Sequence, residues 1–222
     1  MIEKGIIFDN IHSYSDLHLI LSKVEIKPAK PKTSYIDIAG GDGSLDLTEA
    51  HGEVKYSDRD CKFTFTMHPE YGLTDEDFEV KKTEISNLLS GKRFKITLDK
   101  DPDYYYLGRC TVDDFLSNKR IRQIVVTAKV YPYKYKQKET IVRFNLNADE
   151  ETVILKNGRK SVVPIIVCTT KDAVIKFGDG VYTLSQGTNK ILDICLVEGN
   201  NYLTISSTLG GIIAFSYQEA DL

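Results

Sequence analysis

The amino-acid sequence predicts a mainly β protein: an N-terminal β-sandwich or barrel-like domain that contains one α-helix, followed by a C-terminal β-sandwich. Three observations predict this fold. Apolar and polar residues alternate in strand-like runs along the first half, one segment has helical spacing, and short strand-like runs separated by turn residues follow from residue 140. The 222 residues suffice for one large domain or two small ones.

Three segments of the first half are predicted to be half-buried strands: 61–67 (CKFTFTM), 93–98 (RFKITL) and 124–130 (IVVTAKV). In the first of them, the cysteine, the phenylalanines and the methionine fall on one face, and the lysine and the threonines fall on the other. Because successive side chains of a strand point to opposite faces, each segment buries one side and exposes the other.

The segment TDEDFEVKKTEISNLLSG, residues 74–91, is predicted to be the helix of the first domain. Thr74 suits the N-cap, and the acidic residues that follow it suit the positive end of the helix dipole. Gly91 suits the C-terminal end. Four apolar residues recur near helical spacing and form the predicted buried side: Phe78, Ile85, Leu88 and Leu89.

The segment DIAGGDGSLDLTEA, residues 37–50, combines glycines with acidic residues, as metal loops, phosphate-binding loops and tight turns do. Apolar residues alternate into it at Ile36 and Ile38 and out of it at Leu45 and Leu47. No helix start or lysine is placed to receive a phosphate. We therefore predict a strand, a turn in which glycine supplies backbone freedom, and a second strand.

The character of the sequence changes at residues 131–139, which contain lysines and a proline but no aliphatic residue. We interpret this segment as a solvated connector rather than a basic binding patch. The predicted division is an N-terminal domain over 1–135, a linker over 136–140 and a C-terminal sandwich over 141–222.

Eight short strand candidates follow the connector, and their close spacing is typical of a small β-sandwich or jelly roll. Glycine and asparagine between them suit hairpin turns, which need positive φ angles; one of these predicted turns is QGTN, residues 186–189. The candidates are residues 140–146, 152–156, 161–168, 173–177, 181–184, 190–197, 201–206 and 212–217.

Composition and charge argue against several classes of protein. The formal net charge of −3 gives no reason to expect a nucleic-acid-binding surface. The first residues, MIEKGIIFDN, lack the apolar core of a signal peptide, and the longest apolar runs are too short to span a bilayer. These features predict a soluble protein made in the cytosol.

The four cysteines, Cys61, Cys110, Cys168 and Cys195, include no CxxC pair and no zinc-ligand spacing with a nearby histidine. Each lies in an apolar, strand-like run, so we expect reduced, buried thiols. The segment DKDPD, residues 99–103, has acidic residues at calcium-loop spacing but lacks the glycine and glutamate of that loop, and we interpret it as a turn.

No catalytic motif supports an enzymatic function. A GxSxG motif and a phosphate-binding loop are both missing from the sequence. Carboxylate pairs for glycoside hydrolysis are always available among 32 acidic residues, so their presence indicates nothing. We expect no catalytic residue, no cofactor and no metal.

The segment DYYYLGR, residues 103–109, concentrates tyrosines on one predicted strand. Alternation puts Tyr104 and Tyr106 on one face and Tyr105 on the other. Aromatic residues on both faces of a strand indicate either packing between two core layers or contact with a partner.

Several segments together resemble the distal tail protein (Dit) family of siphophages and prophages. The resemblance covers residues 1–135 and thins after residue 140, where the family has a galectin-like or carbohydrate-module-like sandwich. Ala39 stands where the turn of the family has a proline. The resembling segments are 5–21 (GIIFDNIHSYSDLHLIL), 34–50 (SYIDIAGGDGSLDLTEA), 56–65 (YSDRDCKFTF), 88–112 and Pro132–Tyr133.

The resemblance implies a structural, non-enzymatic role at the tip of the virion tail. Members of this family form a hexameric ring that connects the tail tube to the baseplate or tail-tip hub and supports host adsorption. The implied partners are copies of the chain itself, the tail tube protein and the hub or lysin protein, with a receptor-binding protein or a cell-wall glycan as further partners. No cofactor, membrane or specific nucleic acid is implied.

The interface candidates come from two segments, the turn region 37–46 and the tyrosine-rich strand 104–109. They are Asp37, Asp42, Gly43, Asp46, Tyr104, Tyr105 and Arg109. Two other functions stay open at this point. The C-terminal sandwich would also suit a carbohydrate-binding module that attaches to host-wall glycans, whereas a β-rich glycosidase rests only on the abundance of acidic residues.

Overall fold

The computed structural model describes residues 5–50, 52–68, 74–117 and 121–222. The chain divides into two compact units between Lys134 and Tyr135. Strands dominate both units, and the described residues contain one helix, so the prediction of a mainly β fold is confirmed.

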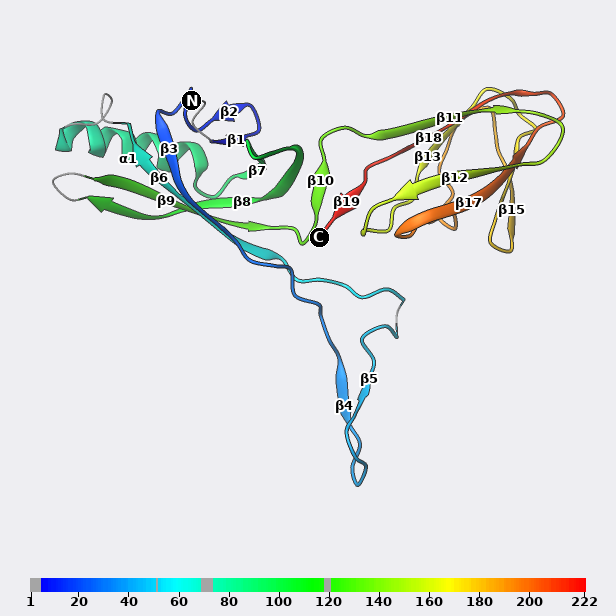
Figure 1. The fold of residues 1–222 in the computed structure, drawn as a ribbon, viewed down its shortest axis with the longest axis horizontal. Helices are drawn as coiled ribbons and strands as arrows, with labels where there is room; N and C mark the ends of the chain where they lie inside the picture. The colour runs from blue at the N-terminus through cyan, green and yellow to red at the C-terminus, as the bar shows by residue number, and fades with distance from the viewer. Residues whose placement is uncertain (1–4, 51, 69–73, 118–120) are drawn as a thin grey trace. The chain divides into compact units, whose positions relative to one another are not determined.

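The N-terminal unit is built on an antiparallel sheet with the strand order β2-β1-β7-β8-β9-β6-β3 (Figure 1). The strands of this sheet and the helix share one apolar core. The strands are β1 (Ile6–Phe8), β2 (Ile11–His12), β3 (Leu19–Ile26), β6 (Arg59–Met67), β7 (Arg93–Leu98), β8 (Asp101–Ser117) and β9 (Arg122–Val130).

Aromatic rings fill the centre of this core. The ring of Phe8 lies 6.3 Å from that of Phe65 and 5.9 Å from that of Phe94, measured between centroids. Along β6, buried residues alternate with more exposed ones, as the period of two predicts. The strand predictions for 61–67, 93–98 and 124–130 are therefore confirmed as β6, β7 and β9.

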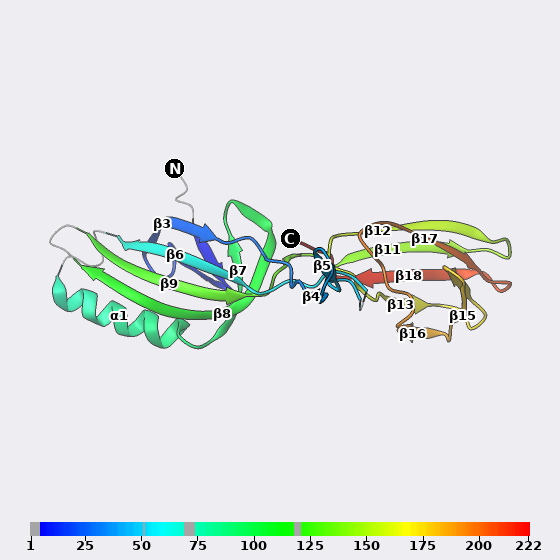
Figure 2. The same ribbon diagram turned by 90° about the horizontal axis from the view of Figure 1, so that it is seen from below.

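Helix α1 (Asp75–Leu89) lies beside β8 and covers part of the core (Figure 2). Thr74 is its N-cap and forms a capping box with Asp77: each side chain bonds the backbone N–H of the other residue. Phe78, Ile85 and Leu89 are buried. The predicted helix and its N-cap are confirmed.

The C-terminal unit is a sandwich of two four-stranded antiparallel sheets, ordered β11-β18-β13-β16 and β12-β17-β14-β15. Their inner faces form a second apolar core. The strands are β11 (Thr140–Leu146), β12 (Glu151–Asn157), β13 (Ile165–Cys168), β14 (Val174–Phe177), β15 (Gly180–Thr183), β16 (Gly187–Asn189), β17 (Gly199–Ser206) and β18 (Gly211–Tyr217). A short strand β10 (Lys134–Lys136) pairs with β19 (Ala220–Asp221).

Two predictions in the C-terminal half were wrong. Residues 190–197 form no strand, although Ile194 and Leu196 are buried, and the segment QGTN, predicted as a turn, contains strand β16. Asparagine side chains explain the first error. Asn157 Nδ2 donates to the carbonyl of Leu196 and Asn201 Nδ2 to that of Val197. With a single β-bridge between Leu196 and Val162, these bonds satisfy backbone groups of the segment without a continuous strand ladder.

The thiols of Cys61, Cys110 and Cys168 are buried, and none of the four cysteines forms a disulfide. Burial raises the pKa of the Cys61 and Cys110 thiols to about 12. Such thiols stay protonated and unreactive at neutral pH, as expected for cysteines that serve as small core residues. Cys195 is partly exposed.

Candidate functional site: an exposed arm and a basic groove

A two-stranded ribbon, here called the arm (residues 27–50 and 52–58), extends the ladder of β3 and β6 (Figure 1). It contains strands β4 (Tyr35–Asp37) and β5 (Ser44–Asp46), which pair antiparallel. Nearer its base, the amide of Lys32 donates to the carbonyl of Lys55 over 2.7 Å. The predicted strand, turn and strand are confirmed.

The arm carries apolar side chains that its own chain does not bury. Every residue from 31 to 46 is exposed. A lone two-stranded ribbon is marginally stable in water, and clustered exposed apolar residues mark interaction surfaces. The exposed fractions are 59% for Tyr35, 51% for Ile36, 54% for Ile38 and 49% for Leu45.

The outer part of the arm is acidic, whereas its base carries four lysines. Residues 33–54 contain five acidic residues and no lysine or arginine. The Ser44 hydroxyl donates to the Asp37 carboxylate across the ribbon over 2.8 Å. Hydrogen bonds from the Thr48 hydroxyl and amide lower the pKa of Asp46, so this carboxylate is ionised at neutral pH.

The tip of the arm needs glycine. Gly40 and Gly43 both have a φ of +77°, in the left-handed region that glycine adopts without strain. Asp42 lies between them on the exposed turn. The acidic residues of the predicted site (Asp37, Asp42 and Asp46) therefore share one ribbon whose geometry depends on its glycines.

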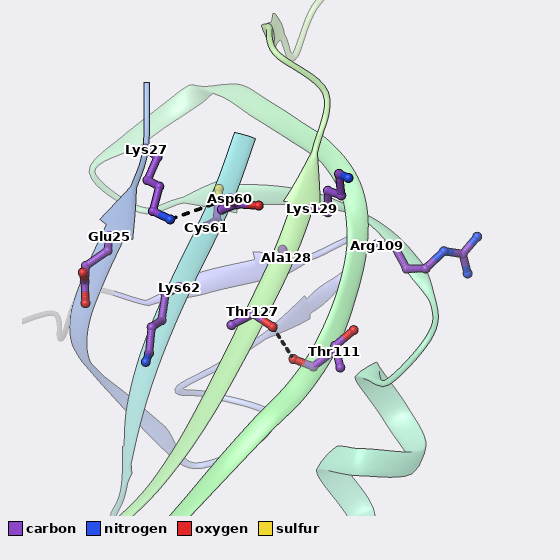
Figure 3. A pocket seen from close by; sticks show the side chains of 10 residues that line it. All are labelled: Glu25, Lys27, Asp60, Cys61, Lys62, Arg109, Thr111, Thr127, Ala128 and Lys129. Atoms are coloured by element: carbon purple, nitrogen blue, oxygen red, sulfur yellow. Dashed lines mark hydrogen bonds and ion pairs between the residues drawn. The ribbon is translucent and has the colours of Figure 1, made fainter. Parts of the chain in front are cut away.

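A groove of about 510 Å³ lies on the sheet formed by β3, β6, β9 and β8 (Figure 3). Its polar side chains occupy the strand positions that alternate with core residues, as Lys62 does between Cys61 and Phe63. We call it the basic groove, because its six charged residues are four cations and two anions: Lys27, Lys62, Arg109, Lys129, Glu25 and Asp60.

Strand register places like charges side by side on the strands of this groove and on the neighbouring strand β7. Arg93 on β7 is opposite Arg109 on β8, and Arg109 is opposite Lys129 on β9. Lys129 is in turn opposite Asp60 on β6. Like charges directly opposite each other destabilise a sheet, so this row favours an anionic partner.

The two acidic residues of the groove already have cationic partners. Asp60 lies 3.5 Å from Lys27 Nζ, and Glu25 lies 2.9 Å from Lys23 Nζ. The hydrogen bond from Lys23 lowers the pKa of Glu25. Among the residues that the structure describes, no carboxylate lies within ion-pair distance of Lys62 or Lys129, so the groove keeps an excess of positive charge.

The predicted residues of β8 separate into two kinds. Tyr105 is only 8% exposed, and Lys95 Nζ lies 4.8 Å from its ring centroid. Lys134 Nζ lies 4.1 Å from the ring centroid of Tyr104. Arg109 borders the groove and donates a hydrogen bond to the carbonyl of Gly91. Both tyrosines therefore make contacts within the chain, and Arg109 alone of the three joins the groove.

Side-chain clusters of the kind that hold a metal ion are not found in the described part of the chain. There, no group of three histidine, cysteine, aspartate or glutamate side chains is arranged to hold a metal ion. Of the DKDPD segment, interpreted as a turn, only residues 99–100 form the turn, and residues 101–103 begin β8. The Asp99 carboxylate accepts a hydrogen bond from the amide of Gly5 over 2.6 Å. No helix among the described residues is long and apolar enough to cross a membrane.

Comparisons with known proteins find matches among solved structures. No family model matches the chain, and no curated protein sequence does. The Dit (gp 19.1) protein of phage SPP1, described as a paradigm of the hub adsorption apparatus in phages that infect Gram-positive bacteria, matches with a TM-score of 0.69 at 16% identity. The match covers 97% of this chain and 98% of that one.

A second structure, a conserved protein of unknown function, PA5104 from Pseudomonas aeruginosa PAO1, matches at 10% identity with a TM-score of 0.29. It covers 89% of this chain, but the TM-score is too low to indicate a shared fold. The SPP1 protein instead matches across both units. The chain therefore has the fold of the SPP1 Dit protein over nearly its whole length.

Proposed function

We propose that this chain is a distal tail protein: a structural, non-enzymatic subunit of a phage tail tip. The observation that carries this proposal is the match of both units, in the same order, to the SPP1 Dit protein over 97% of the chain. The sequence segments that resemble the distal tail protein family also support it.

In this role, the N-terminal domain (residues 1–135) forms a hexameric ring, and the C-terminal sandwich (residues 141–222) is attached to the ring by the linker over 136–140. The ring joins the tail tube to the hub protein, and the sandwich meets a receptor-binding protein or a cell-wall glycan. The arm and the basic groove support a ring, since two different patches that bind head to tail generate closed rings when the rotation closes.

The oligomeric mass of the purified full-length chain tests this function. We expect light scattering coupled to gel filtration to give a species near six times 25.1 kDa, and negative-stain images to show rings. Mixtures with the products of neighbouring tail genes form the second arm of the experiment. A chain that stays monomeric both alone and in these mixtures would contradict the proposal.

Replacing Gly43 by valine is expected to weaken ring assembly without lowering the melting temperature of the N-terminal unit. A β-branched residue at a φ of +77° costs about 1–2 kcal/mol, but no other atom lies within 4 Å of the position where its Cβ would stand. The cost therefore falls on the turn of the arm. Thermal melting and the fraction of protein in rings are the two measurements.

The matched control is Gly43→Asn, since asparagine tolerates the left-handed conformation better than valine. We expect this variant to assemble nearly as well as the parent chain. Equal assembly of the valine variant and the parent would show that the tip geometry is not needed.

A further inference from the structure

We propose that the acidic arm of one copy of this chain docks in the basic groove of a neighbouring copy. The inference rests on the proposed function, and it deepens that function by naming the two surfaces that hold adjacent ring subunits together. Three features of the described residues support it: the exposed apolar and acidic side chains of the arm, the excess positive charge of the groove, and the length of the arm.

The arm exposes apolar side chains and carboxylates that are available for binding. Its apolar side chains, among them Ile36 and Leu45, stay in water. In the described part of the chain, no lysine or arginine pairs with Asp37, Asp42 or Asp46. A ribbon of this kind gains apolar burial and ion pairs together when it meets a basic, hollowed surface.

The basic groove carries an excess of positive charge, which the acidic side chains of the arm would neutralise. Its lining residues Arg109 and Lys129 lie opposite each other on neighbouring strands, and Lys62 adds another lining cation. Arg93, outside the groove on β7, lies opposite Arg109. Anions supplied from outside would relieve this repulsion. The groove is wide enough to accept side chains, and both of its own carboxylates are already paired.

The occupant is a second copy because the arm leaves the sheet beside its own groove. Lys27 and Asp60 line the groove and also form the pair at the base of the arm. From Lys27 to Gly40 the ribbon extends about 40 Å at about 3.3 Å per residue. A domain of this size is about 35 Å across, so the arm can reach a neighbouring subunit.

Charge reversal tests the docking. The variant Asp37→Lys/Asp42→Lys reverses the arm, and Lys62→Glu/Lys129→Glu reverses the groove. We expect each to weaken association between copies about tenfold or more in sedimentation velocity, because favourable pairs become repulsive. The chain that carries all four substitutions has the parent net charge and should regain association. Association of the parent chain should fall as salt concentration rises.

The matched control is Lys171→Glu/Lys190→Glu, which changes the net charge as much as the groove variant but alters exposed lysines of the C-terminal unit. It should associate like the parent. If the groove variant associates no more weakly than this control, or if the four-substitution chain stays dissociated, the proposed docking is wrong.

Cross-linking separates this inference from the proposed function. One copy carries Asp42→Cys and a size tag, the other carries Lys62→Cys, and both carry Cys195→Ser to remove the partly exposed thiol. We expect a flexible bismaleimide to join the tagged copy to the untagged one. Cross-links between copies without any ring would keep the docking and count against the hexameric connector.

Rings that form without these cross-links would support the connector function and show that the docking proposal is wrong. A single chain that carries both Asp42→Cys and Lys62→Cys provides a further check, since cross-linking within a monomer at high dilution would assign the arm to its own groove. A labelled DNA oligonucleotide that binds the parent chain but not the groove variant, with no cross-link between copies, would assign the groove to a polyanion instead.

Discussion

Replacing Gly108 by alanine is expected to destabilise the N-terminal unit by about 3 kcal/mol or more, near the upper end for overpacking substitutions. Gly108 lies on β8, opposite Val130 on β9 and Phe94 on β7. A Cβ added there would stand 2.3 Å from the carbonyl oxygen of Lys129 and 2.5 Å from the Cα of Val130. Because these are backbone atoms in a paired strand, β8 and β9 would have to separate.

Gly91→Ala is the matched control for this prediction. Gly91 has a φ of +75°, but nothing lies within 4 Å of its added Cβ. The alanine there should cost only about 1 kcal/mol through backbone strain. Urea unfolding followed by hydrogen exchange in β8 and β9 measures both. Equal losses in the two variants would refute the close-approach explanation for Gly108.

The expected damage at Gly108 extends to the proposed docking surface. Gly108 precedes Arg109, which is opposite Lys129 in the basic groove. A separation of β8 from β9 would change the spacing of these cations. We therefore expect any Gly108→Ala protein that still folds to associate more weakly than the Gly91→Ala control.

Local patterns in the sequence predicted β6, β7, β9, the helix and its capping residue correctly, because alternation and capping are properties of neighbouring residues. The same patterns could not reveal the exposure of the arm. Ile36, Ile38 and Leu45 alternate with polar residues as a buried strand does, and in this structure all three lie in water. Periodicity indicates which residues share a face, but it does not say which molecule covers that face.

The basic groove was missed for a different reason. Lys62 and Lys129 belong to β6 and β9, and their strands are adjacent only after folding. The sequence pattern identified Arg109 through its tyrosine-rich strand, whereas its neighbours across the sheet needed the strand register. The net charge of −3 is a sum over the whole chain. It therefore does not reveal that acidic residues gather on the arm and basic residues on one face of the sheet.

Replacing Asn201 by alanine is expected to destabilise the C-terminal unit by about 3 kcal/mol, since each buried polar group that loses its partner costs about 1–3 kcal/mol. The buried Asn201 side chain accepts from the amide of Val197 over 2.9 Å. It also donates to the carbonyls of Leu155 and Val197, over 3.2 Å and 2.8 Å. Alanine would leave these backbone groups unpaired in the segment that was wrongly predicted as a strand.

The exposed neighbour Asn200 supplies the control, and Asn200→Ala should change stability by less than about 0.5 kcal/mol. Calorimetry of the full chain, with hydrogen exchange at residues 194–197, distinguishes a local loss from a global one. If Asn201→Ala matched its control, Asn201 would not hold the segment. The bonds of Leu196 to Asn157 and Val162, together with apolar burial, would then keep it in place. The side-chain bonds make the opposite result the expected one, because apolar burial cannot satisfy a backbone amide.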